Sequence, residues 1–415
     1  MDTYEPGSTF KAVTAAAGLE EGAVTRETVF TCRPFEGFFV RPINCWNTRG
    51  THGTQNLARA VHNSCNPAFM RTALNLGVDT FYQYVRDFGF YERTNILLPG
   101  EVRGIFQAQP RELDMLVASF GQRFTITPIQ LITAYAAIAN GGYLMRPRLV
   151  RELTDSDGNV VRSYSPEIIR KVVSRETSEE LRTILEGVVT DGTGRNAYVS
   201  GFRVAGKTGT SETVYEGRYI ASFAAFAPAD NPVVCVLIVL DEPRGPYHMG
   251  GAIAAPVARS LLEDILVYME IEREFTESDR SAMARDVSTP DLSGMTLNDA
   301  IRTLRGAGLD YKVVGSDNDM ERVITMQAPP FEFRVPARST VFLYTEHTGD
   351  VLMVAVPDLR NKTVSEATDA LHRINLNIRV IGGSGSSRSQ NVSPGVLVSE
   401  GSVIEVSFIY TDNIE

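Results

Sequence analysis

The chain has 415 residues, 43% hydrophobic and 22% charged, which is typical of globular proteins with two or three domains. A formal net charge of −10 leaves no basic surface that would favour nucleic acid as a partner. The longest apolar runs, at 131–139 and 233–240, are far shorter than the ~20 residues that span a bilayer. No signal peptide precedes the first motif, so the chain reads as soluble and carries no targeting signal.

The first predicted element is a helix that begins beside Pro6 and Gly7, within "EPGSTFKAVTAAAG". Pro6 and Gly7 supply a turn, and the alanine-rich stretch behind them favours helix. In a helix, Ser8 and Lys11 lie on one side, because residues three apart share a face.

The cysteines and histidines give few signals. Cys32 and Cys45 flank a short aromatic segment and could form a disulfide, whereas Cys235 lies in an apolar strand and is interpreted as core. Cys65 is interpreted as a packed thiol rather than a nucleophile. The histidines are His52, His62, His248, His347 and His372. They lack the close spacing of metal ligands, so no metal site and no cofactor are predicted.

A sheet is predicted from three closely spaced apolar stretches, "FRVAGKTGT", "YIASFAAFA" and "VVCVLIVLDE". Consecutive strands joined by short connections are usually antiparallel neighbours. Helical patterns surround these strands, so residues 1–271 are predicted to form one α/β (α+β) domain. The charged stretch 272–287 has few large apolar residues and is interpreted as a linker.

The C-terminal part contains an internal repeat, in which "TPDLSGMTLNDAIRTLRGAGL" at 289–309 matches "VPDLRNKTVSEATDALHRINL" at 356–376. In each copy a threonine, Thr296 or Thr363, precedes an acidic residue by three, as at the start of a capped helix. Alternating apolar residues follow each helix. Residues 288–347 and 351–412 are therefore predicted to be two small α+β modules.

Three short motifs occur in a suggestive order: Ser8-x-x-Lys11, Ser64-x-Asn66 and Lys207-Thr208-Gly209-Thr210. Each is weak alone, but the ordered set is typical of serine acyltransferases that act on penicillin-like substrates. Ser316-Asp317-Asn318 and Ser389-x-Asn391 also match the second motif. Both lie inside the repeats, after the third motif, and are assigned to turns.

The residue types suit acyl transfer. A serine hydroxyl needs a base, and Lys11 can act as one if burial lowers its pKa. Ser64 can relay a proton to a leaving amine, while Asn66 can bond a substrate amide.

The third motif suits a substrate that ends in a carboxylate. Lys207 and the hydroxyls of Thr208 and Thr210 offer a cation and donors. Gly209 leaves room for a substrate backbone against the strand. The backbone N–H groups of Ser8 and Thr210 could form an oxyanion hole.

Five stretches together resemble the transpeptidase domain of class B penicillin-binding proteins, in the group that serves division and sporulation: "YEPGSTFK", "HNSCNP", "SFGQRFTITPIQLITAYAAIANGG", "DGTGRNAYVSGFRVAGKTGT" and "IASFAAFAPADNP". The two repeats resemble PASTA domains. The resemblance implies the penicillin-binding/β-lactamase-like transpeptidase fold, an antiparallel sheet flanked by helices, followed by two PASTA modules.

The same resemblance implies a D,D-transpeptidase that cross-links peptidoglycan stem peptides. Ser8 would form an acyl-enzyme with a stem peptide or with a β-lactam, without metal or organic cofactor. The full-length form would be membrane-anchored on the outer face of the bacterial cytoplasmic membrane, beside a lipid II glycosyltransferase.

Two departures from the family pattern stand out. Arg123 replaces the glycine that usually ends "SFGQG". The segments that precede the serine motif in the family, including the first strand and helix of the domain, are missing. The chain is therefore expected to be the C-terminal part of a longer protein, with an open sheet edge and reduced stability.

Two other functions stay open at this stage. One is an inert fragment in which the PASTA pair binds wall material or acts as a scaffold. The other is a β-lactam sensor or hydrolase, which is less expected because no deacylating glutamate can be assigned.

Overall fold

The computed structural model describes residues 2–35, 42–47, 50–213, 215, 217–245, 247–314, 320–345, 352–382 and 385–409, without the side chains of 280 and 282–284. The chain divides into two units, residues 1–268 and 269–415. The division falls close to the predicted boundary at 271.

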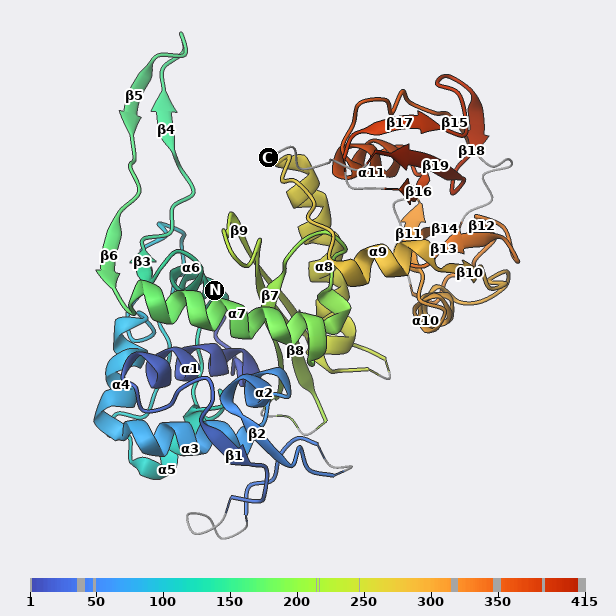
Figure 1. Cartoon of the computed structure of the whole chain (residues 1–415). Helices are drawn as coiled ribbons and strands as arrows, with labels where there is room; N and C mark the ends of the chain where they lie inside the picture. The colour runs from blue at the N-terminus through green and yellow to red at the C-terminus, as the bar shows by residue number, and fades with distance from the viewer. Residues whose placement is uncertain are drawn as a thin grey trace, which may run out of the picture. The chain divides into compact units, whose positions relative to one another are not determined.

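The first unit is rich in helices, several of which surround a central sheet (Figure 1). Its helical elements are η1 (Gly7–Phe10), α1 (Lys11–Glu20), α2 (Leu57–His62), α3 (Asn66–Leu76), α4 (Val78–Asp87), α5 (Glu112–Ala118), α6 (Pro128–Ala139), α7 (Arg175–Asp191), η2 (Arg195–Ala197) and α8 (Gly250–Tyr268).

The central sheet has the order β7 (Ala205–Glu212), β8 (Tyr219–Ala227) and β9 (Val234–Asp241), with both pairs antiparallel. The three strands and their antiparallel pairing confirm the prediction. Residues 221–227 of β8 are all buried, so both faces of the middle strand are covered. Helices α6, α7 and α8 pack against the sheet. The buried sheet thus gives the Lys207 motif on β7 a rigid support.

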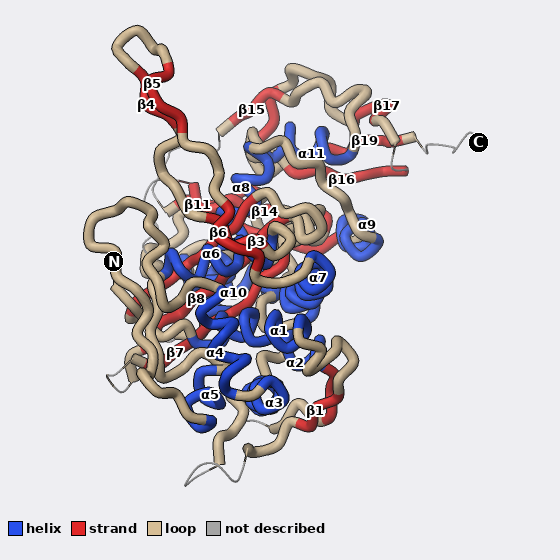
Figure 2. The backbone as a smooth tube through the Cα atoms, turned by 90° about the vertical axis from the view of Figure 1, so that its left-hand side faces the viewer, coloured by secondary structure: helices blue, strands red, loops and turns tan. Residues whose placement is uncertain are grey.

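Smaller strands form three two-stranded pairs around this core: β1 (Val29–Thr31) with β2 (Thr54–Asn56), β3 (Tyr143–Met145) with β6 (Ile168–Lys171), and β4 (Glu152–Thr154) with β5 (Val160–Ser163). The β4/β5 hairpin projects away from the helices of its unit (Figures 1 and 2).

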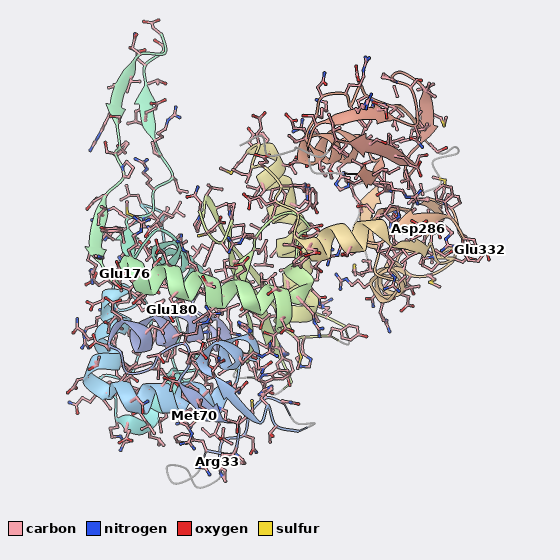
Figure 3. The ribbon with its side chains drawn as sticks, viewed as in Figure 1. Arg33, Met70, Glu176, Glu180, Asp286 and Glu332 are labelled. Atoms are coloured by element: carbon pink, nitrogen blue, oxygen red, sulfur yellow. The ribbon has the colours of Figure 1, made fainter. Side chains whose placement is uncertain are left out.

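Helix α7 shows how the sequence pattern places a helix at the surface. Ser174 caps its first turn by accepting a hydrogen bond from Thr177 N–H. Leu181 and other apolar residues face the core, while Glu176 is exposed and Glu180 is half-buried (Figure 3). This amphipathic pattern explains how α7 packs against the sheet while its acidic residues remain hydrated.

The second unit contains two modules of the same topology, which supports the repeat seen in the sequence. In each, a central strand pairs parallel on one side and antiparallel on the other, in the orders β11-β14-β12 and β16-β19-β17. The first module contains β10 (Asp286–Ser288), α10 (Leu297–Gly306), β11 (Asp310–Val314), β12 (Met326–Ala328), β13 (Arg334–Pro336) and β14 (Thr340–Tyr344). The second contains β15 (Met353–Ala355), α11 (Val364–His372), β16 (Asn377–Gly382), β17 (Ser387–Gln390), β18 (Leu397–Ser399) and β19 (Val403–Phe408).

Both predicted helix caps are present. Thr296 accepts a hydrogen bond from Asp299 N–H at the start of α10, and Thr363 does the same with Glu366 N–H at the start of α11. In α11 the Glu366 carboxylate also accepts from Thr363 N–H, which completes a capping box.

The stretch interpreted as a linker, 272–287, is more structured than its composition suggested. It contains α9 (Glu277–Ala284) and belongs to the second unit. Arg273 is buried, and its guanidinium pairs with Asp369 of the second module at 2.9 Å. A second ion pair joins buried Asp279 to Arg338 of the first module. These ion pairs help to hold the charged segment in place, and a count of apolar residues does not detect them.

No helix in the described residues is long and apolar enough to cross a membrane.

Candidate active site and a cysteine-histidine cluster

The Ser8 motif lies in a tight turn, because η1 holds residues 7–10 directly before α1 begins at Lys11. Gly7 has a φ of +54°, and a Cβ there would lie 2.9 Å from the carbonyl oxygen of Thr210. On the other side, Gly7 N–H donates to the carbonyl of Gly121 at 2.9 Å. The turn that carries half-buried Ser8 is therefore held between the third motif and the "SFGQ" segment.

Arg123, which replaces a family glycine, adopts a left-handed conformation with a φ of +66°. Glycine would tolerate this conformation without strain. The Arg123 N–H donates to the Glu5 carboxylate at 3.0 Å, and the Arg123 side chain is exposed. Glu5 in turn accepts from the Ser211 hydroxyl through its backbone carbonyl at 2.7 Å. Arg123 thus supports the segment before Ser8 through its backbone.

Lys11 is fully buried and bonded to the second motif. Its ammonium group donates to Ser64 O at 2.7 Å, to Ser64 Oγ at 3.1 Å and to Asn66 Oδ1 at 2.6 Å. Burial lowers the pKa of Lys11 to about 7, although the nearby Cys45 and Cys65 oppose this shift. Lys11 can therefore lose its proton near neutral pH, as the base hypothesis requires.

The second motif lies at the junction between α2 and α3. Asn63 is the C-cap residue of α2, and Ser64 adopts a φ of +55°, which is uncommon for a residue other than glycine. Cys65 then precedes α3, which begins at Asn66. This sharp change of direction places Ser64 and Asn66 together around the Lys11 ammonium group.

Lys207 joins the third motif to the second. It is fully buried on β7 and donates to Ser64 Oγ at 2.9 Å and to the carbonyl of Thr208 at 3.2 Å. Burial, together with the charge of Lys11, lowers the pKa of Lys207 well below its usual value. Ser64 Oγ thus receives hydrogen bonds from two buried lysines on different elements.

The other residues of the third motif have specific neighbours. The Thr208 hydroxyl lies 3.0 Å from that of Thr193, and Thr210 Oγ1 accepts from Gly250 N–H at 3.1 Å. Thr193 belongs to the "DGTG" segment, to which sequence reasoning assigned no role. Gly209 serves packing: a Cβ there would lie 2.3 Å from Ser222 Oγ and 2.9 Å from Pro6 O. The absence of a side chain at Gly209 therefore also makes room for the Ser8 turn, and its role beside a substrate backbone stays a prediction.

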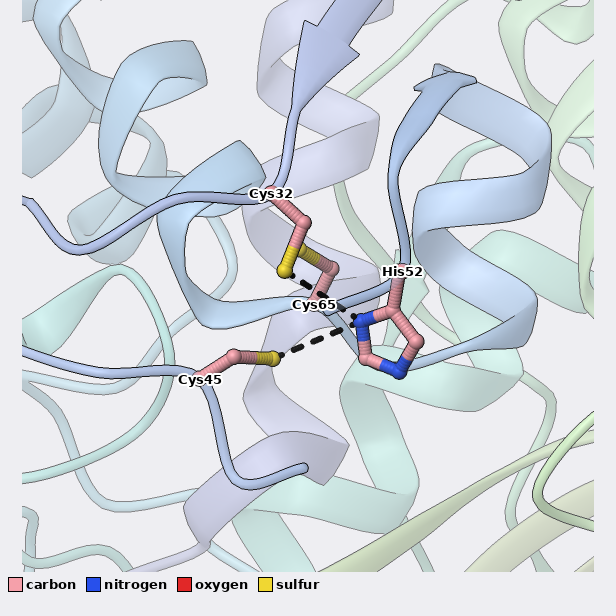
Figure 4. Close-up of side chains that lie close together, drawn as sticks. All are labelled: Cys32, Cys45, His52 and Cys65. Atoms are coloured by element: carbon pink, nitrogen blue, oxygen red, sulfur yellow. Dashed lines mark hydrogen bonds between the residues drawn. The ribbon is translucent and has the colours of Figure 1, made fainter. Parts of the chain in front are cut away.

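A second group of reactive side chains lies beside the second motif (Figure 4). Cys32, Cys45, His52 and Cys65 place their ligand atoms within 4.8 Å of one another. Cys32 and Cys45 are free thiols, so the disulfide considered for them is not formed. Instead, each sulfur lies 3.5 Å from His52 Nδ1. Sequence reasoning predicted no metal site and missed this arrangement.

The thiols of the cluster perturb each other. A hydrogen bond with Cys65 lowers the pKa of Cys45, while the same contact and burial raise that of Cys65. Cys65 is still a packed residue, but it packs against other thiols rather than in a purely apolar core.

The two other matches to the second motif belong to the second part of the chain. Ser389 lies in β17, in the second unit, and Asn391 bonds to Glu405 of β19. The turn assignment was therefore wrong for Ser389, which is a strand residue. Ser316, Asp317 and Asn318 lie outside the described residues.

The fold and the three motifs define a class of protein. The profile of the penicillin binding protein transpeptidase domain matches residues 1–263, and that of the PASTA domain matches 287–347 and 354–408. The chain belongs to the penicillin-binding protein transpeptidase family.

Individual members of this family are similar to the chain over much of its length. Stage V sporulation protein D of Bacillus subtilis is 37% identical over 355 residues, which cover 82% of this chain and 54% of the relative. Penicillin-binding protein PbpB of Mycolicibacterium smegmatis is 32% identical over 63% of this chain and 43% of its own length. The chain thus spans about half the length of the curated relatives that it matches.

Solved structures of proteins from the same family are similar to this chain. Penicillin binding protein 3 from Mycobacterium tuberculosis, in complex with aztreonam, superposes with a TM-score of 0.60 at 28% identity, covering 66% of this chain and 64% of the other. The transpeptidase domain of penicillin-binding protein 3 from Burkholderia pseudomallei gives 0.59 at 28% identity, covering 66% and 82%. The fold class predicted from the sequence is confirmed.

Proposed function

We propose that this chain carries a serine-type D,D-transpeptidase that cross-links peptidoglycan stem peptides and that β-lactams acylate at Ser8. The observation that carries the proposal is the shared hydroxyl of Ser64, which accepts from Lys11 at 3.1 Å and from Lys207 at 2.9 Å. This oxygen joins residues of all three motifs at one point. The neighbouring Ser8 turn packs against the third motif through Gly7.

Acylation begins when neutral Lys11 takes the proton of the Ser8 hydroxyl. Ser8 Oγ bonds to the carbonyl carbon of the penultimate D-alanine, and the bond to the terminal D-alanine nitrogen breaks. The proton held by Lys11 passes to Ser64 Oγ, 3.1 Å away, as Ser64 gives its own proton to the leaving amine. An amine of a second stem peptide then gives a proton to neutral Lys11 and attacks the carbonyl carbon of the ester. The bond from that carbon to Ser8 Oγ breaks, and Lys11 returns the proton to Ser8 Oγ.

The remaining motif residues orient the substrate. Asn66 bonds the substrate amide, while Lys207, Thr208 and Thr210 donate hydrogen bonds to its terminal carboxylate. The negative charge of that carboxylate favours the protonated form of Lys207 when the substrate is bound. The N–H groups of Ser8 and Thr210 stabilise the oxyanion. Gly209 lets the Ser8 turn approach β7 and so keeps these groups close together.

The setting of the enzyme is part of the same proposal. In its full-length form the protein acts on the outer face of the bacterial cytoplasmic membrane, held there by an anchor. A lipid II glycosyltransferase supplies the glycan strands whose stem peptides are joined.

The proposal is tested by incubating the chain with a stem pentapeptide that ends in D-Ala-D-Ala and with labelled glycine or a labelled D-amino acid as the acceptor. We expect release of the terminal D-alanine and incorporation of the acceptor, with no reaction when the peptide ends in L-Ala-L-Ala. A folded chain that releases no D-alanine would contradict the proposal and favour a scaffold role. Rapid release without incorporation would favour a hydrolase.

A further inference from the structure

We infer that Cys32, Cys45, His52 and Cys65 form a tetrahedral zinc site that clamps the Ser64–Asn66 junction in place. Three thiolates and one imidazole are a typical ligand set for structural zinc. Four protein ligands leave no open position, so the ion would hold structure rather than take part in the chemistry at Ser8.

Two distances between the ligand atoms match those of a tetrahedral zinc site. With Zn–S bonds of about 2.3 Å and a Zn–N bond of about 2.0–2.1 Å, a sulfur and a nitrogen ligand in a tetrahedral site lie about 3.5–3.6 Å apart. Cys32 Sγ and Cys45 Sγ each lie 3.5 Å from His52 Nδ1. The four ligand atoms converge from separate segments on one point (Figure 4).

Pairing of the backbone brings the first three ligands together. Cys32 follows β1, and its N–H donates to Gly53 O at 2.9 Å, which places it near His52 at the end of the β1/β2 pair from which the connecting loop leaves. Phe35 and Ile43 exchange two backbone hydrogen bonds, which return the chain toward Cys45. These contacts fix three ligands on one hairpin-like segment.

The fourth ligand ties this segment to the active site. Cys65 lies between Ser64 and Asn66, both of which bind the Lys11 ammonium group. Trp46 Nε1 also donates to Asn63 O at 2.8 Å, which holds the residue after Cys45 against the end of α2. A bond from zinc to Cys65 would therefore stabilise the left-handed conformation of Ser64, and with it the positions of two active-site side chains.

Metal content tests the site independently of the proposed function. Protein purified without added chelator should contain about one zinc per chain, and cobalt substituted for zinc should give the intense visible bands of tetrahedral thiolate coordination. Cys45→Ser should lose the metal, whereas Cys45→His, which supplies another ligand, should keep it. Cys235→Ser, in strand β9, is the matched control and should change nothing.

The effect on the active site rests on the proposed function and is measured separately. Removing zinc with a chelator should slow benzylpenicillin acylation at least tenfold, with zinc but not magnesium restoring the rate. By linkage, the acylated protein should release zinc to a chelator more slowly than the free protein. Zinc at far below one per chain, cobalt without thiolate bands, or a Cys32–Cys45 disulfide in the purified protein would overturn the site. Stoichiometric zinc with acylation and release rates that do not respond to each other would overturn the clamp.

Discussion

The buried cations of the two units have different partners and different roles. In the first, the lysines Lys11 and Lys207 are fully buried and their hydrogen bonds end on hydroxyl, amide and carbonyl oxygens. In the second, buried Arg273 pairs with the carboxylate of Asp369. A buried lysine beside neutral oxygens tends to give up its proton, whereas an arginine guanidinium remains charged in proteins and is well suited to pair with a carboxylate. The first arrangement suits chemistry and the second suits docking of chain segments.

The largest effect is expected from removing the lysine nitrogen at position 11. Lys11→Met keeps most of the side-chain volume but removes the base, so acylation by benzylpenicillin should slow by about 10²–10⁴-fold. Stopped-flow or quenched mass spectrometry measures the rate, and circular dichroism checks the fold. Lys171→Met, at an exposed lysine of β6, is the control and should acylate normally. Wild-type rates in Lys11→Met would exclude Lys11 as the base.

In the second unit, breaking the buried pair should affect stability instead. Asp369→Ala removes the ion pair that this carboxylate makes with the Arg273 guanidinium, whose side chain is 2% exposed, which should lower the free energy of unfolding of this unit by about 3–5 kcal/mol. Denaturant titration of the whole chain measures it. Asp358→Ala, at an exposed pair with Arg360, is the matched control and should leave the transition in place. Equal effects of the two substitutions would show that the buried pair has no special role.

The pH dependence of acylation tests whether the buried Lys11 changes its charge near neutral pH. Because burial lowers the pKa of Lys11 to about 7, the neutral base is lost as pH falls below that value. The acylation rate should therefore drop ~tenfold per pH unit below 7 and level off above it. A rate constant across pH 5 to 9, measured with nitrocefin, gives this profile. A flat profile would mean that Lys11 does not change charge in this range.

The smallest expected effect concerns a helix cap in the second unit. Thr363→Ala removes the hydroxyl that accepts from Glu366 N–H, which should lower the unfolding free energy by about 1 kcal/mol. Thr363→Ser keeps the hydroxyl and should retain most of the stability. Acylation by benzylpenicillin reports on the first unit and should be unchanged in both. A matching loss in the serine variant would attribute the effect to the methyl group.

The sequence predicted those features that depend on local order. The three strands around Lys207 were readable because apolar runs are separated by short turns, and the helix caps at Thr296 and Thr363 because capping acts over three residues. The proximity of Lys11 and Ser64 was inferred from the order of the motifs. That order reflects the resemblance to a family rather than any local physical signal.

Features that depend on long-range packing escaped prediction. Cys32, Cys45, His52 and Cys65 lack the close paired spacing of zinc motifs, and only the β1/β2 pairing and the α2–α3 junction bring them together. The packing of Gly209 against the Ser8 turn joins elements that lie some two hundred residues apart in the chain, which no local pattern reveals. A search for cysteines near catalytic motifs would have singled out Cys65.

The central claim is that Ser8 is a nucleophile activated by the lysine and serine residues of this site. Intact-protein mass spectrometry after incubation with benzylpenicillin tests it most directly, with Ser8→Ala and the strand variant Ser389→Ala measured alongside. The account predicts one covalent adduct per chain in the wild type and in Ser389→Ala, and none in Ser8→Ala. No adduct on a folded wild-type chain, or an adduct that persists in Ser8→Ala, would contradict it.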